Sequence, residues 1–383
     1  MNYQEKITKA FNDRFGNHNP RLFFSPGRIN FIGEHIDYNA GFVMPAAIDK
    51  GVWLAVAANE SDTSNFIAAD INETYSVALN NVAKADGWKN YLLGVLHILQ
   101  QDGFSVKGFD CVFGGNLPQG SGLSSSAAIE AGLLFALNEI FSFGLSRLQM
   151  AKMAQRAEHS YPNAQVGIMD MFASLHGKKD RLILLDCTSL EYQYLPFSSE
   201  DYDVVLINTK VHHTLAGSEY NTRRNECAEG LEILKGIDKS INTFRDVKPE
   251  LVIENKTSFP ENIYMRCLFV TQEIARTQKA AELLKQNDIK AFGKLMFETH
   301  EGLSKLYEVS CPELDFLVDA VKGNDAVIGS RVMGGGFGGC TINLIEKKGR
   351  EQIVAAVSAK YQKQFNINPE VYIVSPEEGT HEL

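Results

Sequence analysis

The sequence predicts a two-domain protein that contains both helices and strands. Its 383 residues exceed the length of about 250–300 at which single hydrophobic cores stop growing. Helical and strand-like segments occur on both sides of a polar, proline-containing stretch at residues 196–201. We therefore expect one domain over residues 1–197 and a second over residues 198–383.

The formal net charge of −10 limits the possible ligands. Nucleic acids and anionic membrane surfaces both require a basic footprint, so neither is an expected partner. A phosphate ligand would have to be held against this charge by backbone N–H groups, basic side chains or a divalent metal. Phosphate binding should therefore depend on a metal.

Cysteine usage and hydropathy favour a cytoplasmic location. The six cysteines are scattered, without a C-x-x-C pair, as is typical of a reducing compartment. The first residues lack the long apolar core of a signal peptide, and no run approaches the roughly 18 apolar residues of a membrane helix. No heptad repeat or long apolar edge is present, so a monomer is expected.

The first elements are a helix followed by strands. Residues 3–15 place apolar side chains on one side at helical spacing. Residues 22–33 are predicted as a strand, a turn at residues 26–27 and a second strand. In that second strand Arg28 and Asn30 would point away from the apolar face.

A polar loop follows at residues 33–41. It holds two carboxylates, a histidine, a tyrosine and an amide between glycines. Such groups can bind the hydroxyls of a polyol. A solvated turn is the alternative, but the apolar strands on both sides favour a cleft.

Residues 88–99 are predicted as a helix that carries two aromatic side chains on one face. Trp88 and Tyr91 are three residues apart, so they are neighbours on the helix surface. Such pairs are usually core residues, and adenine stacking is the alternative. Strands are expected over residues 43–50, 52–58 and 107–113.

Leu117 to Ser126 is a glycine- and serine-rich loop that leads into an apolar helix ending near Phe141. Gly120 and Gly122 can adopt positive φ, and the serines offer hydroxyls and suit a helix N-cap. The N–H groups and positive dipole end of the helix would favour phosphate. The loop lacks the lysine of a P-loop and the third glycine of a dinucleotide motif, and a simple turn before a helix remains the alternative.

Asp170 is the single acid in the apolar segment 166–176. A carboxylate in such surroundings is either buried and paired or functional. A helix over residues 148–158 is expected before this segment, and a strand over residues 181–187 after it.

The second domain is predicted to alternate strands and helices around a glycine-rich segment. Strands are expected over residues 202–208, 326–332, 341–345 and 370–374, and helices over residues 218–234, 265–285 and 289–308. Gly334 to Gly339 holds five glycines in six residues. Its bare backbone could approach a ligand or a neighbouring chain closely.

Five separate stretches resemble one family. Residues 117–127 look like the phosphate loop of the GHMP small-molecule kinases, and residues 334–339 look like their glycine-rich third motif. Residues 26–39 closely resemble the galactokinase signature, and residues 167–170 and 218–227 also look like galactokinase segments. These matches keep the family order and extend over most of the chain.

The resemblance implies an α+β fold with a ribosomal-protein-S5-like N-terminal domain and a ferredoxin-like C-terminal domain. The active site would lie in the cleft between them. The implied reaction transfers the γ-phosphoryl group of ATP to the anomeric 1-hydroxyl of α-D-galactose, with Mg²⁺ as cofactor. The products would be galactose 1-phosphate and ADP, in the first committed step of galactose use by the Leloir pathway.

The resemblance also implies roles for individual residues. The sugar would be held by Glu34, His35, Asp37, Gly167, Asp170 and Tyr220. Adenine would lie against Trp88 and Tyr91, and the phosphates would be cradled by Gly120, Ser121, Gly122, Leu123, Ser124, Ser125 and Ser126. Ser126 and Glu158 would hold Mg²⁺. Asp170 would orient the sugar hydroxyl and accept its proton, or chiefly align it, with Arg28 as its stabilising partner.

The sequence departs from the commoner galactokinase pattern at three positions. Ile36, Met171 and Met333 stand where threonine, glutamine and threonine are usual, which leaves discrimination among galactose derivatives open. The alternatives are a sugar 1-kinase for N-acetylgalactosamine or L-arabinose, and a non-catalytic regulator that binds galactose and ATP. The intact serines of residues 124–126 and Asp170 argue against a regulator.

Overall fold

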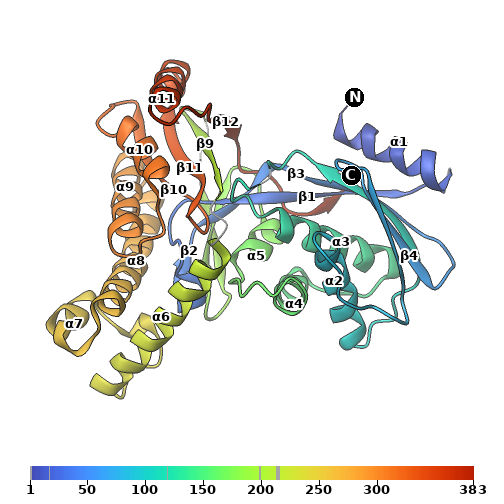
Figure 1. The fold of residues 1–383 in the computed structure, drawn as a ribbon, viewed down its shortest axis with the longest axis horizontal. Coiled ribbons are helices and arrows are strands. Elements are labelled where there is room, and N and C mark those ends of the chain that lie inside the picture. The colour runs from blue at the N-terminus through green and yellow to red at the C-terminus, as the bar shows by residue number, and fades with distance from the viewer. Residues whose placement is uncertain (1, 17, 119, 198–199, 213–215) are drawn as a thin grey trace.

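A computed structural model describes residues 2–16, 18–118, 120–197, 200–212 and 216–383 (Figure 1). Most of the first half of the chain lies at the right of this view and most of the second half at the left, while the C-terminus lies at the right. The domain boundary expected after residue 197 falls at residues 198 and 199, which lie outside the described residues.

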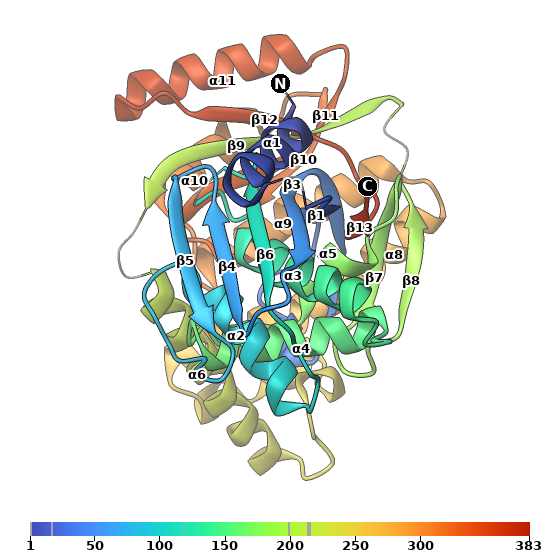
Figure 2. The same ribbon diagram turned by 90° about the vertical axis from the view of Figure 1, so that its right-hand side faces the viewer.

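A six-stranded sheet organises the first half, with strand order β13-β1-β3-β6-β4-β5. Only β4 and β6 are parallel neighbours. The strands are β1 (Arg21–Asn30), β3 (Pro45–Ala58), β4 (Thr63–Ala68), β5 (Glu73–Ala78), β6 (Phe109–Gly115) and β13 (His381–Glu382). The last strand of the chain thus returns to the first sheet, beside β1 (Figure 2).

Helices cover both faces of this sheet. On one face α1 (Tyr3–Phe15) packs Ile7 and Phe11 against Ala55 and Val112. On the other face lie α2 (Lys89–Gln101), α3 (Ser125–Phe141), α4 (Arg147–Ser160) and α5 (Met169–His176). Helices α3 and α5 contact β1 and β3, and α2 and α4 pack on α3. Helix α3 is apolar on most sides, and a helix of this kind is stable where it is buried, as α3 is at the centre of this half.

The turn predicted at residues 26–27 is wrong. Strand β1 continues through Pro26, with Ser25 paired to Val52 and Arg28 paired to Ala47 of β3, and the register shifts between them. A proline, which has no N–H group, is tolerated in a strand at such an irregularity. The two strands expected between residues 43 and 58 are likewise a single long strand, preceded by the short β2 (Phe42–Val43).

The second half is organised by an antiparallel sheet of order β10-β11-β9-β12. Its strands are β9 (Tyr202–His212), β10 (Val327–Val332), β11 (Gly338–Glu346) and β12 (Glu370–Val374). Its helices are α6 (Ala216–Ile237), α7 (Pro249–Glu254), α8 (Glu261–Lys285), α9 (Ile289–Lys305), α10 (Pro312–Val321) and α11 (Arg350–Phe365). Strands β7 (Arg181–Asp186) and β8 (Tyr192–Pro196) form a third sheet with β2. The sequence did not predict β4, β5, β8, α7, α10 or α11.

One cluster of buried side chains joins the two halves just beyond the end of β1. The ring of Phe31 lies 4.9 Å from that of Phe197 and 6.1 Å from that of Phe292, between centroids. Ile342 of β11 belongs to the same cluster. The polar loop that follows β1 is therefore fixed against both halves of the molecule.

Across the described residues, no helix combines the length and apolar character needed to cross a membrane. All six cysteines are free.

Candidate active site

The predicted site residues gather mainly around two pockets. The first, which we call the apolar pocket, has a volume of about 320 Å³. Trp88 and Tyr91 form part of its wall, and Gly120, Ser125 and Ser126 lie at its polar side. The Trp88 ring packs 5.4 Å from Phe113, and its Nε1 donates to Glu73 at 2.7 Å. The two aromatic side chains are therefore wall residues of a pocket rather than fully buried core.

The loop before α3 takes the left-handed backbone that its glycines allow. Gly120 and Gly122 have φ of 66° and 73°. Ser121 braces the loop through a 2.6 Å hydrogen bond from its hydroxyl to Pro118 O. Leu123 is buried, and its carbonyl accepts from the backbone N–H of Arg28 at 3.1 Å.

Ser124 corrects the expectation of a serine hydroxyl cap. It occupies the N-cap position of α3, but with φ of 58°, and its side chain makes no capping hydrogen bond. Its hydroxyl instead donates to Asp170 Oδ2. The left-handed conformation turns this side chain away from the first turn of the helix and towards the acid.

Asp170 and Arg28 form a bidentate pair. Arg28 Nε and Nη2 donate to the two carboxylate oxygens at 2.7 and 2.8 Å, and Nη1 donates to Gly122 O at 2.5 Å. Burial by itself would lower the pKa of Arg28, but the charges of Asp170 and Glu34 outweigh it and raise that pKa. Arg28 therefore remains a cation and joins Asp170 to the loop.

The second pocket, which we call the acidic pocket, has a volume of about 200 Å³. It brings together all six predicted sugar residues, Glu34, His35, Asp37, Gly167, Asp170 and Tyr220. Arg28, Val166, Met169, Gly334 and Gly335 complete its lining. Residues from four separate stretches of the chain thus converge on one cavity.

Gly167 is required by the close approach of Asp37. A Cβ atom at position 167 would lie 1.7 Å from Asp37 Oδ2. Burial, together with the charges of Asp170 and Glu34, raises the pKa of Asp37 to about 7. Three carboxylates within one small pocket therefore repel one another, and this repulsion contributes to the raised pKa of Asp37.

His35 has both ring nitrogens bonded within the protein. Nε2 lies 3.1 Å from Gly335 O, and Nδ1 lies 2.7 Å from the Tyr38 hydroxyl. Because a carbonyl can only accept, the ring proton is on Nε2, and Nδ1 accepts from Tyr38. Burial lowers the pKa of His35 to about 4, so the ring is neutral.

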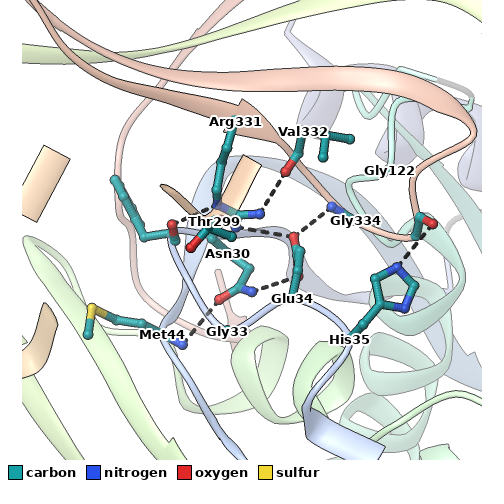
Figure 3. A network of polar contacts seen from close by, with 12 residues as sticks. Asn30, Gly33, Glu34, His35, Met44, Gly122, Thr299, Arg331, Val332 and Gly334 are labelled. Carbon is teal, nitrogen blue, oxygen red and sulfur yellow. Dashed lines mark hydrogen bonds and ion pairs between the residues drawn. The ribbon is translucent and has the colours of Figure 1, made fainter. Parts of the chain in front are cut away.

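Glu34 is the most enclosed acid of the pocket, at 1% exposure. Figure 3 shows its contacts with Asn30 of β1 and with Arg331 and Gly334 of the second half. Gly334 also approaches the loop before α3, because a Cβ atom there would lie 3.3 Å from Gly122 O. The glycine-rich segment thus lies between the polar loop and the glycine–serine loop.

Ser126 and Glu158 are neighbours, as a shared cation would require. Burial raises the pKa of Glu158 to about 7, and the nearby Ser126 side chain opposes this rise. A hydroxyl and a carboxylate are hard oxygen donors of the kind Mg²⁺ takes beside phosphate oxygens. Within the described part of the chain, no group of three or more His, Cys, Asp and Glu side chains could hold a metal. Ser126 and Glu158 could therefore supply two ligands to a metal whose other ligands come from a bound phosphate.

Sequence reasoning missed some of the site. Glu130 of α3 is fully buried near Glu158, and burial together with the charge of Glu158 raises its pKa well above the usual range. Its place four residues after Ser126, and so on the same face of an apolar helix, was the available signal. Val166 and Met169 flank predicted residues, so adjacency alone could have suggested them.

The three departures from the commoner galactokinase pattern do not line the acidic pocket. Ile36, Met171 and Met333 are each buried, with exposures of 0%, 0% and 1%. Ile36 packs beneath Gly41, where an added Cβ would come within 2.8 Å of it. These side chains serve packing beside the pocket.

Models of known protein families match three segments of the chain. The model of the galactokinase galactose-binding signature matches residues 9–58. The models of the GHMP kinase N-terminal domain and C-terminal domain match residues 90–178 and 280–363. Together they account for more than half of the chain.

Similar proteins cover the chain almost completely. A galactokinase of Bacillus subtilis is 39% identical over 99% of both chains. A galactokinase of Thermotoga neapolitana is 38% identical over 94% of this chain and 99% of its own. The crystal structure of Lactococcus lactis galactokinase complexed with galactose superposes with a TM-score of 0.95 at 32% identity, over 99% of both chains. The two-domain α+β architecture is thereby confirmed.

Proposed function

The chain belongs to the galactokinases of the GHMP kinase family, and we propose that it transfers the γ-phosphoryl group of ATP to the anomeric hydroxyl of α-D-galactose. The oxygen–phosphorus bond to the sugar forms as the bond to ADP breaks, and the hydroxyl proton leaves to a protein carboxylate. The products are galactose 1-phosphate and ADP.

The contacts of Asp170 carry this proposal. Its carboxylate lines the acidic pocket, is held by Arg28 and accepts from Ser124 of the loop before α3. An acid that faces a polyol-binding pocket while touching a phosphate-binding loop is placed for phosphoryl transfer. Asp170 aligns the sugar O1 and takes its proton, a role typically worth about 10²–10⁴ in rate.

Arg28 and the loop contribute charge and alignment. Phosphoryl transfer needs mainly an in-line geometry and neutralisation of the charge on the transferred group. Arg28 supplies a buried cation next to Asp170 and fixes the Gly122 carbonyl. The N–H groups of residues 120–126 and the start of α3 hold the phosphate oxygens.

The apolar pocket holds the adenine. Trp88 and Tyr91 provide flat apolar walls, and Gly120, Ser125 and Ser126 lie where the phosphates would leave the pocket. Ser126 and Glu158 would hold Mg²⁺, which would supply neutralisation of the phosphate charge. The overall negative charge of the chain makes that neutralisation necessary.

The acidic pocket binds the sugar and determines which sugar is accepted. Glu34 and Asp37 accept from hydroxyls and are our candidates for recognising the axial 4-hydroxyl, which distinguishes galactose from glucose. A site built to pair with a hydroxyl can reject an analogue lacking it by about 10⁴–10⁵, because its own polar groups would remain unpaired. Two domains that meet near residue 197, with the last strand β13 in the sheet of the first, a monomeric state and a cytoplasmic location complete the proposal.

An ADP-release assay over a panel of sugars tests this function. With galactose, glucose, N-acetylgalactosamine and L-arabinose, we expect galactose to give the highest kcat/KM. A higher value for either of the last two would indicate a related sugar 1-kinase. Equal values for galactose and glucose would refute the roles of Glu34 and Asp37. No release with any sugar would indicate a regulator.

A further inference from the structure

Arg331, in β10, is a fully buried cation at the junction of the two halves (Figure 3). Its Nε donates to Phe31 O at 2.8 Å, and its Nη1 donates to Val332 O at 2.6 Å. Its Nη2 donates to Asn30 O and, at 3.2 Å, to Glu34 Oε1. A buried guanidinium is tolerated only when it is paired and hydrogen-bonded, so these contacts fix its position closely.

Glu34 is correspondingly constrained by three donors among the described residues. Oε1 accepts from Arg331 and, at 2.7 Å, from the backbone N–H of Gly334. Oε2 accepts from Asn30 Nδ2 at 2.7 Å. A carboxylate offers about four acceptor positions, so about one is left, on Oε2. Because Glu34 lines the acidic pocket, that position is the one it can offer to a ligand.

The direction of this remaining acceptor is set from the other half of the molecule. Arg331 and Gly334 both come from the second half, whereas Glu34 and Asn30 belong to the first. Hydrogen bonds weaken steeply when their angle departs from the preferred range, so a rotated carboxylate would bind a hydroxyl poorly. Without Arg331, Oε1 would keep only the Gly334 N–H.

We propose that Arg331 is a positioning residue for sugar recognition, which acts by orienting Glu34. The inference rests on the proposed function, because it takes the acidic pocket to be the sugar site. It predicts that a residue outside the pocket lining controls the affinity for galactose and leaves the affinity for ATP nearly unchanged.

Arg266 of α8 offers a matched control. It is also buried, at 2% exposure, and donates to Glu226 at 2.8 Å, Leu306 O at 2.6 Å and Glu308 at 2.5 Å. It lines neither pocket. A substitution there therefore reports the general cost of disturbing a buried arginine.

The experiment compares Arg331→Lys, Arg331→Met and Arg266→Lys with the wild-type protein, after thermal unfolding has identified the folded variants. A lysine keeps the charge but cannot reproduce the planar fork that reaches three carbonyls and a carboxylate. For both Arg331 variants we expect the KM for galactose to rise about 10- to 100-fold, as for loss of a hydrogen bond to a charged group. We expect the KM for ATP to stay near the wild-type value, and Arg266→Lys to change neither KM appreciably.

An unchanged KM for galactose in folded Arg331 variants would overturn the proposal, as would an equal rise in both KM values. A second measurement uses only wild-type protein. Galactose without ATP should slow amide exchange over residues 330–336 several-fold, and more than over residues 261–270 around Arg266. Equal protection of both segments, or none at 330–336, would also overturn the proposal. Wild-type turnover of galactose is measured first, since its absence would contradict the proposed function instead.

Discussion

The apolar pocket and the acidic pocket are built in opposite ways. All the lining residues of the apolar pocket lie between positions 52 and 129, within the first half of the chain. The acidic pocket combines Glu34 and Asp170 of the first half with Tyr220 and Gly334 of the second. One pocket is complete in a single half, whereas the other exists only where the two halves meet.

The difference extends to the forces in each pocket. The lining of the apolar pocket is mainly apolar and aromatic and includes one acid, Asp70. The acidic pocket holds three carboxylates, and their repulsion and burial raise the pKa of Asp37. We therefore expect nucleotide binding to survive changes that abolish sugar binding or transfer.

The largest expected effect is on turnover. Asp170→Ala and Asp170→Asn should lower kcat by about 10²–10⁴, because the aligning and proton-accepting carboxylate is lost. The KM for ATP should change little, since Asp170 does not line the apolar pocket. Steady-state kinetics measure both.

Asp203→Asn is the control for this change, because Asp203 is also paired to an arginine, Arg350 at 2.7 Å, but lies in neither pocket. It should retain normal turnover. Near wild-type kcat in both Asp170 variants would contradict the mechanism.

A smaller effect is expected from the metal pair. Glu158→Gln should raise the Mg²⁺ concentration for half-maximal activity by at least about 10-fold, because a carboxylate donor is replaced by an amide. The KM for galactose should stay close to the wild-type value. Titration of activity with Mg²⁺ measures the effect, and Glu139→Gln on the partly exposed end of α3 is the control. Identical Mg²⁺ curves for all three proteins would refute the assignment of Glu158.

Asp37 gives a pH-dependent effect on stability. Folding raises its pKa from 3.8 to about 7, so the folded protein binds this proton more tightly than the unfolded chain. The resulting stabilisation is full below about pH 4 and is lost as the pH rises through about 7. The asparagine of Asp37→Asn cannot ionise, so the variant should have a higher unfolding free energy than the wild type. This difference should be about 1–3 kcal/mol larger at pH 8 than at pH 5.

Denaturant unfolding of both proteins at these two pH values, without sugar, checks this prediction. His35 titrates in the opposite sense, because its pKa falls from 6.5 to about 4 and its contribution is lost as the pH falls through that range. Comparing variant with wild type at each pH cancels the contribution of His35. A difference that is the same at pH 5 and pH 8 would show that Asp37 is not perturbed.

The smallest effect is expected at the departures from the commoner pattern. Ile36→Thr and Met333→Thr should leave the ratio of kcat/KM for galactose and N-acetylgalactosamine within about twofold, because neither side chain lines the acidic pocket. Ile36→Thr should lower the unfolding free energy by about 1–3 kcal/mol, because it buries a hydroxyl in an apolar site. A changed sugar preference would mean that these positions act on the pocket through their neighbours.

The same contrast explains what the sequence could predict. The glycine–serine loop (residues 117–126) and the polar loop (residues 33–41) are each one continuous segment of the chain. Their residue types alone therefore predicted phosphate binding for the first and polyol binding for the second. The turn at residues 26–27 was a local signal that pairing of β1 with β3 overrides. The contact of Ser124 with Asp170 depends on a left-handed backbone that composition does not specify.

Contacts between the two halves of the chain could not be predicted from the sequence either. Arg331 and Glu34 are separated by 297 positions, and no spacing rule joins them. By contrast, α11 could have been found, since Ile353, Val357 and Tyr361 recur every four residues on its buried face. The start of α10 was also marked, by Pro312 in its first turn and by the acids that follow.

The position of the transferred phosphate tests the central claim most directly. We propose that Asp170 and Arg28 meet the anomeric oxygen of the sugar at the boundary between the two pockets. Phosphorus and proton NMR of the product from galactose and MgATP should show phosphate on O1 in the α configuration. Phosphate on any other hydroxyl would contradict this arrangement.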